Sequence, residues 1–273
     1  MRRTIVSYII IIIIILCTAL PSCKWNAWTS PDSEKEDGIK VERYDRLQSR
    51  YLTTGDFSAL QSMNTNYPME TRTLVENILQ LGTVDQQDIN ERMLRFYQDT
   101  TLQNIIVDVE SQYANMDDIN DALTLAFRKL RKSIPNMKTP EFYAQIGALN
   151  QSIIIGDGTV GICLDKYLGT EYPIYRKYYY DHQIQTMKRS QIVPDCLLFY
   201  LLSLYPMEKL DSSTQESRDA HIGKIMYIVN TILAEKVFTT PYVKLAERYM
   251  YKHPRTSMDS LLRMQWQKKA ARQ

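Results

Sequence analysis

Two short runs of β-branched residues interrupt a chain whose other apolar residues mostly follow a helical repeat. The runs cover residues 152–155 and 159–164 and are separated by Gly-Asp-Gly at positions 156–158. Glycine readily adopts the positive φ angles of tight turns, so this stretch predicts a β-hairpin. Residues 142–146 are a candidate third strand. We expect the hairpin and this strand to form the small sheet on which the helices pack.

Capping residues and apolar stripes predict a series of helices before the sheet. Asp56 can cap one helix, Pro68 suits the first position of the next, and Gly82 can end it. In the segments that follow, apolar residues recur three and four positions apart, which places them on one face of each helix. The expected helices cover residues 56–66, 68–82, 85–97 with a start at Asp85 or Asp88, 102–113 and 117–134.

The C-terminal half is also expected to be helical. Residues 196–204 are almost continuously apolar and predict a buried helix that ends before Pro206. Further helices are expected over residues 220–235 and 241–251. The basic tail, residues 255–272, differs in composition and could fray.

The segment 169–180 contains five tyrosines among charged residues. On a helix, Tyr172, Tyr175 and Tyr179 share one face, and we expect this face to pack against the sheet while Tyr178 points outward. A recognition surface is the alternative, because tyrosine supplies rigid contact area with a polar tip.

These elements predict an α+β fold that is predominantly α-helical, with helices packed on a hairpin or a three-stranded sheet. We expect a single domain over residues 39–273. Its two parts are a helical layer, residues 39–138, and a part with the sheet and the C-terminal helices, residues 139–273.

Residues 1–22 have the features of a bacterial lipoprotein signal peptide. Two arginines precede an apolar run over residues 5–16, and the segment ends in Leu-Pro-Ser-Cys at 20–23. The run is shorter than the roughly 20 residues of a membrane-spanning helix, although residues 5–20 could span with strain. Leu-Pro-Ser-Cys resembles a lipobox, in which Cys23 is acylated and becomes the mature N-terminus.

Residues 23–38 are expected to form a lipid-anchored tether. This stretch carries a run of charged residues and two tryptophans, Trp25 and Trp28, which suit a bilayer interface or could dock on the folded domain. The whole chain has 33 basic and 31 acidic residues, and two of the basic ones lie in the signal peptide, so the mature chain is near neutral. It lacks the basic surplus that nucleic-acid binding requires.

Five short motifs follow one another in order between residues 39 and 250. They are V-E-R-Y-D-R-L at 41–47, Y-P at 67–68 with I-L-Q-L-G at 78–82, L-D-K-Y-L-G at 164–169, V-P-D at 193–195, and G-K-I-M-Y at 223–227. In this order they resemble the motifs of the gliding motility-associated lipoprotein B family of Bacteroidota. The resemblance implies a lipoprotein of the cell envelope implicated in gliding and secretion, and the lipobox and tether lead us to expect that the anchored domain faces the periplasm. It also implies a fold related to zincin-like metallopeptidases. Members of that family run on further after the last motif.

A zincin needs two histidines four residues apart with a glutamate between them, so that both imidazoles reach one zinc ion. The sequence has no such motif, and its three histidines, His182, His221 and His253, are separated by 39 and 32 residues. We therefore expect no metal and no other cofactor, although a site built from these distant histidines stays open. Cys163 and Cys196 could form a disulfide in the oxidising periplasm or remain thiols.

The function that the sequence favours is that of a non-catalytic envelope lipoprotein that binds protein partners at the membrane. The alternatives are a hydrolase with an atypical site, and a periplasmic lipoprotein that binds glycans or peptides. For two candidate residues a structural role is the competing explanation: Asp165 as a hydrogen-bond acceptor and Asp195 as a helix cap. The candidates for a cleft beside the sheet are Asp165, Lys166, Tyr167, Tyr178, Asp195 and His221.

Overall fold

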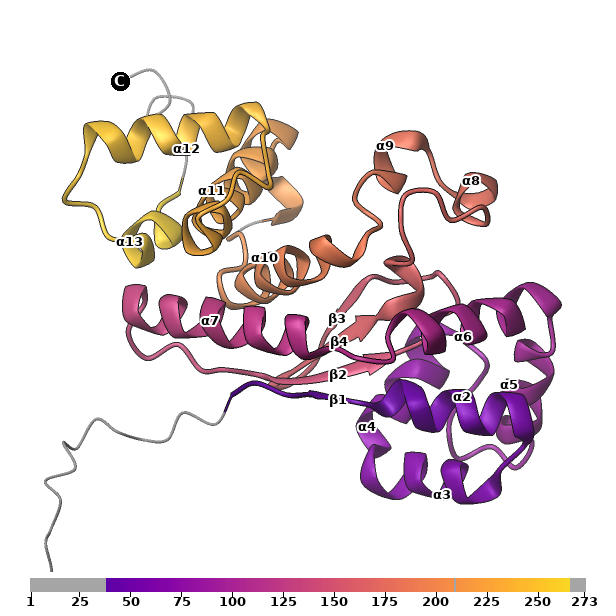
Figure 1. The fold of residues 1–273 in the computed structure, drawn as a ribbon. Coiled ribbons are helices and arrows are strands. Elements are labelled where there is room, and N and C mark those ends of the chain that lie inside the picture. Colours follow the sequence, from indigo (N-terminus) through magenta and orange to yellow (C-terminus); the bar gives the residue numbers. More distant parts are fainter. Residues whose placement is uncertain (1–37, 209, 266–273) are drawn as a thin grey trace, which may run out of the picture. The chain divides into compact units, whose positions relative to one another are not determined.

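A four-stranded sheet lies at the centre of the protein, in the strand order β1-β2-β4-β3 (Figure 1). The computed structural model describes residues 38–208 and 210–265, which form one compact unit from Gly38 onward. Cys23 and the tether lie outside these residues. Strands β1, β2 and β4 are parallel, and β3 runs antiparallel to β4. The strands are β1 (Val41–Glu42), β2 (Glu141–Gln145), β3 (Ile153–Ile155) and β4 (Thr159–Cys163).

The expected hairpin is confirmed as β3 and β4, and the expected third strand is confirmed as β2. The expectation of a three-stranded sheet was wrong, because β1 pairs with the outer side of β2, with Val41 opposite Phe142. Two residues are too few to show the alternation that marks a strand, and their partner is far along the chain. The strand therefore lies in the part of the sequence that was expected to be a helical layer.

Helices α2 to α6 gather at one end of the sheet (Figure 1). As expected, Asp56 caps α3, because its side chain accepts a hydrogen bond from the N–H of Ser58 at 2.8 Å. The helix expected over residues 68–82 is shorter: it begins at Pro68 as α4 and continues as a π-helical segment, Thr73–Ile78. The five helices are α2 (Tyr44–Thr54), α3 (Phe57–Asn66), α4 (Pro68–Arg72), α5 (Ile89–Tyr97) and α6 (Thr100–Gln112).

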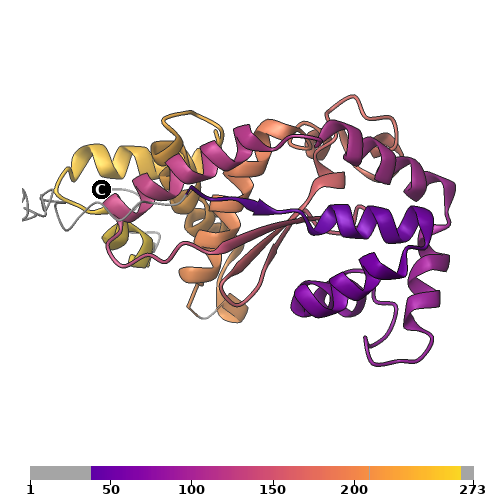
Figure 2. The same ribbon diagram turned by 60° about the horizontal axis from the view of Figure 1, so that its bottom comes forward.

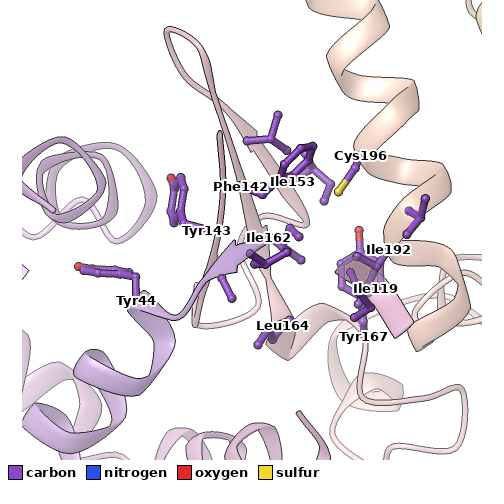
Figure 3. Packing of buried hydrophobic residues seen from close by; sticks show 14 of the residues in the cluster. Tyr44, Ile119, Phe142, Tyr143, Ile153, Ile162, Leu164, Tyr167, Ile192 and Cys196 are labelled. Atoms are coloured by element: carbon purple, nitrogen blue, oxygen red, sulfur yellow. The ribbon is translucent and has the colours of Figure 1, made fainter. Parts of the chain in front are cut away.

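Helices α7 (Asp117–Ser133) and α10 (Ile192–Leu204) cover one face of the sheet. On this face the ring of Phe142 packs edge-to-face on Phe127 of α7, with 5.4 Å between the ring centroids. Successive side chains of a strand point to opposite faces, so the next residue, Tyr143, points away from α10 (Figure 3).

Three C-terminal helices form a second group beside α7, opposite the N-terminal helices (Figure 2). The part of the basic tail that the structure describes is folded, contrary to expectation, because Leu261 and Leu262 are buried in α13. None of the helices within the described ranges is long and apolar enough to cross a bilayer. The three helices are α11 (Gln215–Leu233), α12 (Pro241–Lys252) and α13 (Met258–Arg263).

The tyrosine-rich segment 169–180 is not one helix. Pro173 restricts the residue before it, and the segment contains one short helix, α8 (Tyr175–Tyr178); a second, α9 (Asp181–Ile184), follows it. The three tyrosines nevertheless pack together: the ring centroid of Tyr175 lies 5.1 Å from that of Tyr172 and 6.0 Å from that of Tyr179. Tyr175 is fully buried, and the other two rings pack against the core.

Candidate functional site

Asp165 lies in the core, in a 3₁₀ turn (Leu164–Lys166) directly after β4. Its Oδ1 accepts a hydrogen bond from the N–H of Gly147 at 2.8 Å, and its Oδ2 accepts one from the N–H of Leu149 at 2.5 Å. Burial raises the pKa of this carboxyl above its ordinary value, while the two amide donors act in the opposite direction. The side chain thereby holds the loop after β2, in which Ala148 and Leu149 adopt positive φ angles of 50° and 65°.

Other buried polar side chains hold the same loop. Gln48 of α2 both donates to the carbonyl oxygen of Ile146 and accepts from its N–H, each at 2.9 Å. The hydroxyl of Tyr97 donates to the same carbonyl at 2.8 Å, and the hydroxyl of Tyr179 donates to the carbonyl of Leu149. Since Asp165 belongs to this network, its contacts are those of a structural acceptor.

Tyr167 and Asp195 form a second buried polar pair. The hydroxyl of Tyr167 donates to Oδ2 of Asp195 at 2.9 Å, and Nε2 of Gln191 donates to Oδ1 at 3.0 Å. Asp195 lies in the first turn of α10, yet its oxygens bond these side chains and do not cap the helix. Burial raises the pKa of Asp195 to about 6, against the lowering effect of both hydrogen bonds.

Lys166 and Tyr178 lie closer to the surface. The ammonium group of Lys166 is 3.8 Å from the ring centroid of Tyr179, a cation–π contact. Tyr178 is 64% exposed. His221 is on α11, in the C-terminal group of helices (Figure 1), and its Nε2 lies 2.8 Å from the carbonyl oxygen of Tyr205. The six candidate residues therefore do not meet in one cleft.

The remaining histidines lie against aromatic rings: His182 stacks on Tyr180 and His253 stacks on Tyr249. Across residues 38–208 and 210–265 no group of three or more His, Cys, Asp or Glu side chains could hold a metal ion. Cys163 and Cys196 are buried free thiols.

A groove of about 780 Å³ lies between the hairpin and the helical chain of α4 and the π-helical segment. We call it the hairpin groove; it is lined by residues within 66–78, by residues within 151–159 and by Tyr143. Met69 is 66% exposed, and Ile154 is partly exposed, so both offer apolar surface. One wall includes the π-helical segment, a kind of turn that often occurs at functional sites.

Tyr143 forms the base of the hairpin groove. Its ring lies against Gly161 of β4, where a Cβ atom would be 2.5 Å from the ring, so only glycine leaves room for it. The ring also packs edge-to-face on Tyr44 at 6.3 Å between centroids. Tyr143 is 5% exposed, and its hydroxyl forms no hydrogen bond with any of the residues described; its oxygen is not buried without a partner, as Gln145 Oε1 is, and so reaches solvent. Burial raises the pKa of this hydroxyl, which keeps it protonated and able to donate.

The sequence contains one signal for this groove. A glycine inside a strand often marks the close approach of another group, and Gly161 stands in the middle of β4. The groove itself brings together two segments far apart in the chain, and no local pattern connects them.

The chain matches no curated protein and no solved structure. The expected zincin-like fold is therefore not confirmed. The family model described as gliding motility protein GldB matches residues 26–239, which is most of the chain. The chain therefore belongs to this family of gliding motility lipoproteins, as its ordered motifs indicated.

Proposed function

We propose that this protein is a non-catalytic lipoprotein of the cell envelope that binds protein partners through the hairpin groove. The observation that carries the proposal is the base of the groove, where the Tyr143 hydroxyl lies beside exposed apolar surface and has no partner among the described residues. A bound chain can accept a hydrogen bond from this hydroxyl while it covers the exposed apolar surface beside it.

The titratable groups with shifted pKa values support binding over chemistry. Asp165 and Asp195 are the buried carboxyls whose pKa values are raised, and both are engaged in hydrogen bonds that hold the core. Among the residues that line the hairpin groove there is no histidine, cysteine or lysine, and its carboxylates, Glu70 and Asp157, have no histidine or lysine beside them in the lining with which to form a catalytic pair. The groove thus has the features of a contact surface. A periplasmic protein or peptide suits its mixed lining better than a nucleic acid.

The same proposal includes a lipid on Cys23 that holds the protein at the membrane with the domain facing the periplasm. Membership of a family of envelope lipoproteins supports it, as does the Leu-Pro-Ser-Cys motif. Residues 24–37 can span at most about 50 Å, so the hairpin groove would stay within reach of other membrane-anchored proteins.

Two matched substitutions test the role of the groove. Met69→Lys places a positive charge on the exposed apolar wall, whereas Tyr251→Lys places one on a residue that is 87% exposed and lies on α12, away from the groove. Membranes of cells that produce each variant would be crosslinked and the lipoprotein purified. We expect the envelope proteins that co-purify with the wild type to be lost with Met69→Lys and retained with Tyr251→Lys. Equal retention with both variants would contradict the proposal.

A Cys23→Ser variant tests the anchor separately. We expect the wild type to incorporate radiolabelled palmitate and to sediment with membranes, and the variant to do neither. Incorporation of the label by Cys23→Ser would show that the lipid is attached elsewhere.

A further inference from the structure

We infer that the hairpin groove binds an extended peptide segment of a partner protein, which adds as a strand to the outer edge of β3 and carries lysine or arginine beside its apolar residues. This inference rests on the proposed function and specifies the chemistry of the partner at the same site.

The two edges of the sheet differ in how their backbone groups are satisfied. At the β1 edge, α7 covers the strand: the N–H of Ile39 donates to Oγ1 of Thr124 at 2.8 Å, and the N–H of Val41 donates to Oδ1 of Asn120 at 3.0 Å. These side chains occupy the donors that another strand would need. The β1 edge is therefore closed to strand addition.

The β3 edge is open. The N–H of Cys163 donates to the carbonyl of Ser152, and the N–H of Gly156 donates to the carbonyl of Thr159, each at 2.9 Å. In an antiparallel pair such bonds alternate along the strand, so the N–H and C=O groups of Ile153 and Ile155 point away from β4. Within the described ranges, no other residue hydrogen-bonds to these groups. A peptide can accept or donate up to four hydrogen bonds there.

The side chains next to this edge suit an extended peptide. Ile154 of β3 and Tyr143 of β2 both pair with Gly161 of β4, one from each side. Paired residues of neighbouring strands point to the same face of a sheet, so the side chains of Ile154 and Tyr143 both point into the groove. Every second side chain of an added strand would lie over this face, beside Ile154 and Met69. Strand β3 is Ile-Ile-Ile, without the lysine or proline that usually protects an exposed edge.

The charge of the groove selects the partner. Glu70 and Asp157 line it, and no lysine or arginine does so among the described residues. A peptide with a lysine or arginine near its apolar residues would therefore be attracted, and an acidic peptide would be repelled.

The probe is an array of acetylated heptapeptides in which Val, Ile, Thr and Tyr alternate and the flanking positions are Lys, Ser or Glu. Binding is measured with the full chain in detergent micelles, and the strongest peptide is then titrated by fluorescence anisotropy. We expect the bound peptides to be rich in Lys and poor in Glu. Raising the salt concentration, or replacing Glu70 and Asp157 with Gln and Asn, should weaken the titrated peptide about threefold to tenfold.

A matched pair of variants tests the backbone contact. Ile155→Pro removes an N–H that faces away from β4, so the hairpin keeps its own ladder, whereas Ile155→Val keeps the N–H. We expect Ile155→Pro to weaken binding at least about tenfold and Ile155→Val to leave it within about twofold. Circular dichroism spectra and melting temperatures would show that both variants are folded.

Unchanged binding by a folded Ile155→Pro variant would overturn strand addition, as would the absence of any bound peptide at millimolar concentration. A preference for Glu-containing peptides would overturn the charge assignment. Concentration-dependent dimers that Ile155→Pro abolishes would show that a second copy of this chain, and not a foreign peptide, occupies the edge. Loss of envelope partners with Met69→Lys despite equal binding by the two Ile155 variants would leave the proposed function standing and remove only this inference.

Discussion

Asp165→Ala should destabilise the protein through the loop that follows β2. The substitution removes both acceptors of the buried carboxyl, so the N–H groups of Gly147 and Leu149 lose bonds of 2.8 and 2.5 Å. The site is fully buried, and water cannot easily replace the lost oxygens. Leu149, which adopts a positive φ angle, would lose one of the contacts that hold it in place.

The expected loss follows from these two donors. A buried donor left without a partner costs about 1–3 kcal/mol, so two cost about 2–6 kcal/mol. Relief from burying a carboxyl offsets part of this, since burial raises the pKa of Asp165. We expect a net loss of about 3 kcal/mol for Asp165→Ala. For Asp165→Asn, which keeps one acceptor oxygen and nearly the same shape, we expect about 1–2 kcal/mol.

Guanidinium denaturation followed by far-UV circular dichroism measures these differences. The control is Asp121→Ala, because Asp121 is exposed on α7 and its replacement should change the unfolding free energy by less than about 0.5 kcal/mol. A loss below about 1 kcal/mol for Asp165→Ala would refute the structural role. The competing hypothesis, that Asp165 is a binding residue, would then regain support.

Three further predictions concern pH and packing. Burial raises the pKa of Asp195 to about 6, above its unfolded value of about 4. The stabilisation by the protonated carboxyl is therefore present below about pH 4, and it is lost as the pH rises through 6. Urea unfolding at a series of pH values should show this loss of stability, on the order of 2 kcal/mol, for the wild type and a flatter curve for Asp195→Asn. Gly161→Ala places a methyl group against the ring of Tyr143 and should cost about 1–3 kcal/mol in thermal melts. Lys224 donates to carbonyls at the end of α13, and burial lowers its pKa to about 8. Stability should therefore rise between about pH 8 and 10, and Lys224→Met should abolish that rise and speed hydrogen exchange in α13.

Local signals predicted those parts of the fold that depend on neighbouring residues. The Gly-Asp-Gly turn identified the hairpin, and Asp56 identified the start of α3, because both act within a few positions of the chain. Strand β1 was missed because its identity as a strand comes from pairing with β2 and not from its own two residues. Leu261 and Leu262 were hidden by the basic composition of the tail.

The site was harder to predict than the fold. Asp165 was correctly placed at the end of a strand, but its burial depends on two amides from another loop, which no sequence spacing reveals. The hairpin groove joins residues near 70 to residues near 155, and the tyrosine at its base was read only as part of a strand. Contacts between residues far apart in the sequence determine both the burial of Asp165 and the position of the groove.

The most direct test of the account is site-specific photo-crosslinking in intact cells. A photoreactive amino acid would replace Met69 in the hairpin groove or, as control, Tyr251 on α12, both of which are exposed. The account predicts a discrete adduct with an envelope protein from position 69, weakened by Ile155→Pro in the same chain, and no such adduct from position 251. No adduct from position 69, or the same adducts from both positions, would contradict the claim that this groove is where the protein binds its partner.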